Sequence, residues 1–215
     1  EILNLVNFAD NPSMPKKLPP SEISFLIFFA KLSSSVLFIF LISSISFAQE
    51  YNIDTTKSEL KWTGTELTTN THYGSIDFKS GSITLSEGQP IKGKFIVDMT
   101  TLKNQDLPEA YRGRLEGHLR SDDFFSVDKF SEAILEITGS NKLNTGGFDV
   151  NGNLTIKGIT HPVSFSMSPE DDYWVANLIF DRSKYDVRFR SGTFFENLGD
   201  KLIYDDIVIE TQLRF

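Results

Sequence analysis

Residues 91–99 read Ile-Lys-Gly-Lys-Phe-Ile-Val-Asp-Met, and this stretch decides the fold class. Apolar or small residues occupy every second position, while Lys92, Lys94 and Asp98 stand between them. Successive side chains of a β-strand point to opposite faces of its sheet. The pattern therefore predicts a strand with one buried face and one solvated face.

The same alternation recurs on both sides of this stretch. It is found in the segments 59–64, 76–78, 82–86, 133–137, 148–156, 163–167, 174–180 and 207–215. Turns such as 87–90 and 144–147 separate them. About eight strands joined by short turns predict an antiparallel meander, and closing that sheet on itself removes its exposed edges. We therefore expect an all-β fold, an antiparallel barrel of about eight strands.

One segment departs from this alternation. Its large apolar residues recur at every fourth position, at Leu107, Tyr111, Leu115 and Leu119. This spacing predicts a short amphipathic helix over about 106–120 that packs on the barrel. Asp106, Pro108 and Glu109 resemble an N-cap, a first-turn proline and a capping-box partner.

The N-terminal part has a different composition. Residues 23–48 are almost wholly apolar and end in Ser46-Phe47-Ala48, which places small residues at the two positions that a signal peptidase reads. We interpret 14–48 as a signal peptide, and 1–13 as a product of start-site choice upstream of Met14. The alternative is a transmembrane anchor, since the apolar run is long enough to span a bilayer. If the signal is cleaved, no stable anchor remains, and the 49–215 domain is periplasmic or secreted.

The net charge limits the possible binding partners, and the cysteine content limits how the domain can be stabilised. The formal net charge is -8 at pH 7, which disfavours nucleic acid and anionic lipid surfaces as partners. The chain contains no cysteine, so the exported domain must be held by its core and hydrogen bonds.

The sequence offers little for catalysis or metal binding. None of the 3 histidines stands at metal-ligand spacing, and no Gly-x-Ser-x-Gly elbow is present. We expect His118 to cap or hydrogen-bond at the helix end, and His161 to face solvent at a turn. Calcium loops are lacking, and the acidic pairs are assigned to turns: Asp122-Asp123, Asp171-Asp172 and Asp205-Asp206. We therefore expect no catalytic residue, no metal and no cofactor.

The interior can be interpreted in two ways. Large apolar residues come from the inward-facing positions of the predicted strands, from the end of the predicted helix and from the segment after it. They are Trp62, Phe95, Val97, Leu119, Phe124, Phe125, Ile156, Phe165, Trp174 and Phe180. These side chains could fill the barrel completely, or they could surround a ligand. Glycines within strands, at Gly64, Gly93 and Gly152, fit either space for a ligand or bends. Patterning alone leaves both readings open.

Four motifs together resemble one known family. They are 118–130 (HLRSDDFFSVDKF), 152–163 (GNLTIKGITHPV), the opening from Tyr51-Asn52-Ile53-Asp54 to Lys61-Trp62, and 180–185 (FDRSKY). In this order they are similar to the YceI-like family along nearly all of 49–215. Two departures concern the barrel mouth: Ser126 replaces a usually acidic residue, and 188–206 reads as an inserted loop.

The resemblance implies an extended, lipocalin-like, eight-stranded barrel with the helix over one opening. It also implies a periplasmic or secreted protein that binds a polyisoprenoid, an isoprenoid quinone or a similar lipid without a cofactor, for transport or storage. Arg120, Ser121 and Asp123, beside Phe124 and Phe125, are the candidates for holding a headgroup. For Arg120, a structural ion pair is an equal alternative, with Asp181 or Glu132 as its partner.

Two other functional hypotheses remain at this point. One is a hydrolase or isomerase acting on a small amphiphile, and the other is a packed structural or stress-response module. The fold also permits a homodimer through an exposed strand or through the mouth.

Overall fold

The computed structural model describes residues 47–68 and 70–215. The proposed start-site segment 1–13 and nearly all of the proposed signal peptide 14–48 lie outside this part. None of the helices that it contains is both long and apolar enough to cross a lipid bilayer.

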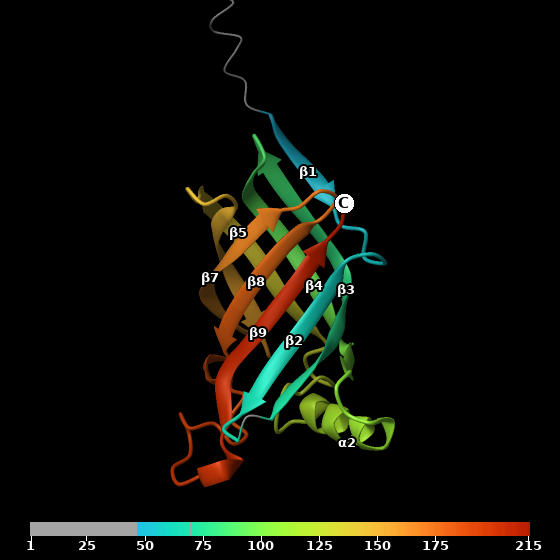
Figure 1. Ribbon diagram of the computed structural model, residues 1–215, viewed down its shortest axis with the longest axis vertical. Coiled ribbons are helices and arrows are strands. Elements are labelled where there is room, and N and C mark those ends of the chain that lie inside the picture. Colours follow the sequence, from blue (N-terminus) through green and yellow to red (C-terminus); the bar gives the residue numbers. More distant parts are fainter. Residues whose placement is uncertain (1–46, 69) are drawn as a thin grey trace, which may run out of the picture. The chain divides into compact units, whose positions relative to one another are not determined.

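A closed antiparallel barrel forms the body of the molecule (Figure 1). The strands are β1 (Ala48–Asn52), β2 (Glu59–Glu66), β3 (Thr71–Ser86), β4 (Gln89–Asn104), β5 (Glu132–Lys142), β6 (Phe148–Ile156), β7 (Ile159–Pro169), β8 (Trp174–Asp181) and β9 (Ile203–Leu213). Eight of them close the ring in the order β2-β9-β8-β7-β6-β5-β4-β3, and β3 pairs again with β2. The predicted eight-stranded barrel is confirmed.

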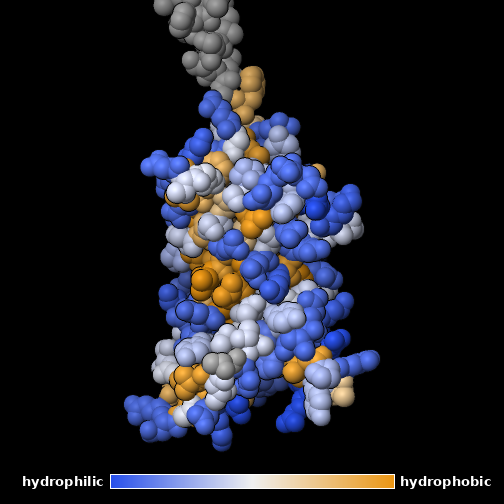
Figure 2. All heavy atoms as spheres, in the orientation of Figure 1, coloured by the Kyte–Doolittle hydropathy of each residue, from blue (hydrophilic) through white to orange (hydrophobic). Residues whose placement is uncertain are grey.

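The first strand, β1, was not anticipated. It pairs antiparallel with β3, from Ala48 opposite Ser86 to Asn52 opposite Ser82. Because β3 has 16 residues and β2 has 8, β2 covers one end of β3 and β1 covers the other end. Figure 2 shows that hydrophilic residues cover most of one outer face, as the alternation requires.

The predicted helix is present as α2 (Glu109–Arg120), but its start is different. Pro108 occupies the N-cap with extended backbone, and no side chain caps the helix. Asp106 cannot act as the cap because its carboxylate accepts hydrogen bonds from His72 Nδ1 at 2.8 Å and from the Tyr73 amide at 2.9 Å. The predicted capping box is therefore wrong, and Asp106 instead ties the segment before α2 to β3.

The connection between β8 and β9 is built around Arg182, which is 0% exposed. A short 3-10 helix, η1 (Arg182–Tyr185), begins it, and a second, η2 (Gly199–Lys201), precedes β9. The Arg182 guanidinium donates to the carbonyl oxygens of Val187, Phe189, Ile203 and Tyr204. Its Nη2 also lies 3.1 Å from Asp205 Oδ1.

This arrangement corrects two expectations. Asp205 and Asp206 lie within β9 rather than in a turn, because β9 begins at Ile203, and the predicted loop 188–206 is correspondingly shorter. Asp205 Oδ2 accepts from the Ser191 and Thr193 hydroxyls, at 2.7 and 2.8 Å, so the loop is also fixed from the strand side. His161 is in β7 rather than at a turn, and its Nε2 lies 3.0 Å from the Lys184 carbonyl.

Candidate functional site

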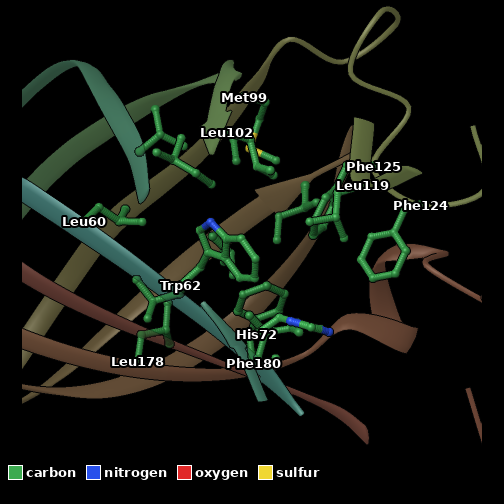
Figure 3. Close-up of a pocket in the computed structure, with 18 of the residues that line it drawn as sticks. Leu60, Trp62, His72, Met99, Leu102, Leu119, Phe124, Phe125, Leu178 and Phe180 are labelled. Atoms are coloured by element: carbon green, nitrogen blue, oxygen red, sulfur yellow. The ribbon is translucent and has the colours of Figure 1, made fainter. Parts of the chain in front are cut away.

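The barrel is hollow. A cavity of about 730 Å³ runs inside it, lined by inward-facing residues of β2 to β9 and by one side of α2 (Figure 3). Of the two interpretations that the pattern left open, the structure thus supports the hollow interior. A volume of this size holds about 24 water-sized groups at about 30 Å³ each.

Most of the predicted apolar site residues form the cavity wall. These are Trp62, Phe95, Val97, Leu119, Phe124, Phe125, Ile156, Phe165 and Phe180. Trp62 also has its polar atom satisfied, because its Nε1 donates to the Lys103 carbonyl at 3.2 Å. Trp174 is not in the wall: its ring stacks on Phe148 at a centroid distance of 5.9 Å.

The three polar residues predicted for the headgroup lie outside the cavity wall. Arg120 donates to the Leu102 carbonyl of β4, and the Ser121 hydroxyl donates to the His118 carbonyl at 2.7 Å. Asp123 lines a neighbouring shallow depression. The alternative ion pair of Arg120 with Asp181 or Glu132 is wrong. Its hydrogen bond to the Leu102 carbonyl connects α2 to β4, and its ion-pair partner, at 3.9 Å, is Glu116 on the same helix.

Among the strand glycines that were singled out, only Gly64 lines the cavity within the described residues. A β-carbon at Gly93 would lie 3.0 Å from the Ser82 carbonyl oxygen, and one at Gly152 would lie 2.7 Å from that of Glu136. At both positions glycine permits close approach of a neighbouring strand and provides no space for a ligand.

The ionisable side chains of the wall gather at the helix end of the barrel. We call this end the mouth and define it by Glu66, His72, Arg114, His118 and Arg190. Glu66 ends β2 and His72 is near the start of β3, whereas Arg114 and His118 lie on α2. Arg114 is exposed and still lines the cavity, so the cavity reaches solvent here.

The sequence reading did not identify this set as a site. Its members come from four separate segments, and only Arg114 and His118 carried a local signal. They are four residues apart on a predicted helix and therefore lie on the same face.

His118 has an unusual environment for a histidine. Its ring packs against Phe189 at 4.3 Å and against Phe124 at 5.9 Å between ring centroids. Burial lowers the pKa of His118 below its ordinary value; the Asp123 carboxylate opposes this shift, and Arg190 adds to it. Its Nε2 is buried and has no hydrogen-bond partner, so this atom does not make the hydrogen bond that was expected of His118.

Across the portion of the chain that the structure covers, no group of three or more His, Asp or Glu side chains comes together as a metal site. His72 and Asp106 do pair, and burial of that carboxylate works against its ionisation. Hydrogen bonds from His72, the Tyr73 amide and Asn104 outweigh the burial and hold the pKa of Asp106 below its ordinary value.

Curated relatives align with this chain over only part of their length. A UPF0312 protein of Yersinia enterocolitica is 39% identical over 92 residues, which is 43% of this chain and 45% of that protein. A UPF0312 protein of Pseudomonas aeruginosa is 36% identical over 105 residues, covering 47% and 52% of the two chains. The chain thus spans about half the length of these relatives.

Solved structures share the fold at low sequence identity. Burkholderia cenocepacia BcnA superposes with a TM-score of 0.59 at 16% identity, covering 75% of this chain and 98% of that chain. A polyisoprenoid binding domain from Saccharophagus degradans gives a TM-score of 0.50 at 14% identity, covering 78% and 97%. The YceI-like domain matches residues 51–215, which include all eight strands of the ring and the last two residues of β1. The chain belongs to the YceI-like domain family.

Proposed function

We propose that this protein binds one long apolar amphiphile, a polyisoprenoid, an isoprenoid quinone or a similar lipid, inside its barrel for transport or storage. The observation that carries the proposal is the 730 Å³ cavity with an almost wholly apolar wall. The solved Saccharophagus degradans relative is a polyisoprenoid binding domain, which supports the same class of ligand. Export to the periplasm or beyond the cell is part of the proposal and is supported by the signal-like sequence before Gln49.

The energetics favour long chains over small ligands. Burying a CH₂ group yields about 0.8 kcal/mol, so a chain of about 15 carbons gains on the order of 12 kcal/mol before the costs of association. An apolar wall gives this gain without directional contacts. We therefore assign the tail to the wall residues Trp62, Phe95, Val97, Phe165 and Phe180. Because the contacts are not directional, we expect the cavity to accept different lipid chains of similar width.

Binding rather than catalysis is the role that the mouth supports. His118 packs among aromatic rings, and the His72 Nδ1 is directed to Asp106. In the described residues, neither His72 Nδ1, which faces Asp106, nor His118 Nε2, which has no partner, is hydrogen-bonded to a serine or threonine hydroxyl. The pairing of a nucleophile with a base that acyl transfer requires is therefore not assembled at the mouth.

The test combines a direct search for ligand with a matched pair of variants. Purified protein is extracted with organic solvent, and the extract is analysed by mass spectrometry; a stoichiometric lipid is expected. Leu178 and Ile179 are adjacent on β8, but Leu178 is 6% exposed in the cavity wall and Ile179 is 59% exposed outside. Leu178→Gln should reduce lipid uptake, whereas Ile179→Gln should not. Empty extracts, together with no change in melting temperature on adding prenyl alcohols, would refute the proposal.

A further inference from the structure

The arginines of this protein divide into two groups. Five have hydrogen-bond or ion-pair partners: Arg112, Arg120, Arg182, Arg188 and Arg214. The guanidinium groups of Arg114 and Arg190 have neither within the described part of the chain. These two are also the arginines that line the cavity. The two guanidinium groups without partners therefore lie at the opening of the cavity.

The backbone holds both arginines at the mouth. Arg114 lies on α2, one helical turn before His118 and on the same face. Arg190 has a left-handed backbone (φ 51°), and its carbonyl accepts from the Ile203 amide at 3.0 Å. The Arg190 guanidinium lies over the Phe189 ring at 5.1 Å, and His118 packs on that same ring. His118 and Arg190 thus meet at one aromatic side chain.

Three nitrogen-bearing side chains without hydrogen-bond partners at Nε2 or the guanidinium therefore line the mouth within the described residues. The buried Nε2 of His118 has no partner, and buried polar atoms in folded proteins nearly always have one. Glu66 is the one carboxylate in the described cavity wall, and it accepts from Asn70 Nδ2 at 3.4 Å. The wall at the mouth therefore carries two guanidinium groups against one carboxylate, while the Asp106 and Asp123 carboxylates lie outside the wall, near His72 and His118.

We propose that Arg114, His118 and Arg190 form a subsite for a small acidic headgroup, a carboxylate or a phosphate, so that the preferred ligands are anionic single-chain amphiphiles. This inference rests on the proposed function, since the tail must occupy the barrel. Guanidinium groups bind carboxylate and phosphate oxygens through charge-assisted, often bidentate hydrogen bonds. Neutral His118 donates or accepts one further hydrogen bond through Nε2, according to its tautomer.

The test compares ligands that differ only in the headgroup. Dissociation constants of palmitate and hexadecanol, and of farnesyl phosphate and farnesol, are measured on the purified protein at one pH and ionic strength. Each acid should bind about 10- to 100-fold more tightly than its alcohol, as expected for hydrogen bonds to charged groups. Acetate and inorganic phosphate alone should not bind measurably, because they lack a tail for the cavity.

Variants then assign the effect to the mouth. Arg114→Gln combined with Arg190→Gln should abolish the preference of the protein for palmitate over hexadecanol and for farnesyl phosphate over farnesol. Arg112→Gln is the matched control, since Arg112 is on the same helix but does not line the cavity, and its guanidinium donates to the Leu107 carbonyl. It should keep the preference for acids.

The possible failures are distinguishable. Equal binding of acids and alcohols by the wild-type protein would overturn the headgroup subsite and leave the proposed lipid binding intact. A preference for acids that survives in the folded double variant would also overturn the subsite. Binding of none of the four amphiphiles would overturn both proposals.

Discussion

A substitution at Ala176 tests whether the tail reaches the end of the barrel opposite α2. Ala176 is buried in the cavity wall and pairs with Thr211 and Met167, near the start of β8 and the end of β9. Figure 1 shows this end of the barrel far from α2. Ala176→Phe would place an aromatic ring into space that the cavity now provides.

The cavity volume gives the expected magnitude. The new ring adds about six carbons, which leaves room for about 18 of the about 24 water-sized groups. Geranylgeraniol has about 21 heavy atoms, so about three would be excluded from the cavity. At about 0.8 kcal/mol each, this costs about 2.4 kcal/mol, or about 50-fold in the dissociation constant. Geraniol, with half the chain length, should bind Ala176→Phe as well as it binds the wild type.

The assay is a fluorescence or calorimetric titration of both alcohols into each variant, after circular dichroism has shown native strand content. Asn177→Phe is the matched control, because Asn177 is the next residue of β8 and is exposed. Ala133→Phe provides a second comparison: Ala133 lines the cavity at the start of β5, near α2, so the new ring should weaken both alcohols. If folded Ala176→Phe binds geranylgeraniol with unchanged affinity, the tail does not extend to this end and the reasoning is refuted.

Three further predictions concern stability. Asp205→Ala leaves the buried charge of Arg182 without its carboxylate and should lower the free energy of unfolding by about 3 kcal/mol in urea titrations; a loss below about 1 kcal/mol would show that the carbonyl acceptors suffice. Gly74→Ala should cost about 1–3 kcal/mol, since its β-carbon would lie 1.8 Å from a β4 carbonyl oxygen, whereas Gly113→Ala on α2 meets no atom within 4 Å and should be neutral or stabilising. The pKa of His118 is lowered by burial, so its contribution to stability is complete above the ordinary value of 6.5 and declines as pH falls below it; melting temperatures of His118→Gln between pH 7 and 5 should therefore fall less steeply than those of the wild type.

The strands were predictable because alternation records which side chains face inward. It does not record the height of a residue along the barrel axis, and for this reason Trp174 was assigned to the cavity although it stacks on Phe148 outside the wall. It also does not record whether opposite walls touch. The hollow interior could therefore not be predicted from the sequence pattern and is shown only by the structure.

The mouth was the least predictable part. Sequence proximity favoured Arg120, Ser121 and Asp123 because they adjoin Phe124-Phe125, but Arg120 is directed to the Leu102 carbonyl. Arg190 enters the mouth because Arg182, Ile203 and Asp205 fold the loop back onto β9, and these contacts join residues far apart in the sequence. The helix was found from its apolar spacing, yet its N-cap was wrong because Asp106 is bound by β3.

The buried Arg182 has a consequence for the thermodynamics of ligand uptake. Its guanidinium holds the carbonyls of Val187 and Phe189, and Asp205 holds Ser191 and Thr193, so one rim of the opening is ordered before a ligand arrives. Association then need not pay the conformational entropy of folding this loop, and more of the gain from tail burial is retained as affinity. Calorimetry should accordingly give a negative heat-capacity change that grows with chain length and contains no additional contribution from coupled folding.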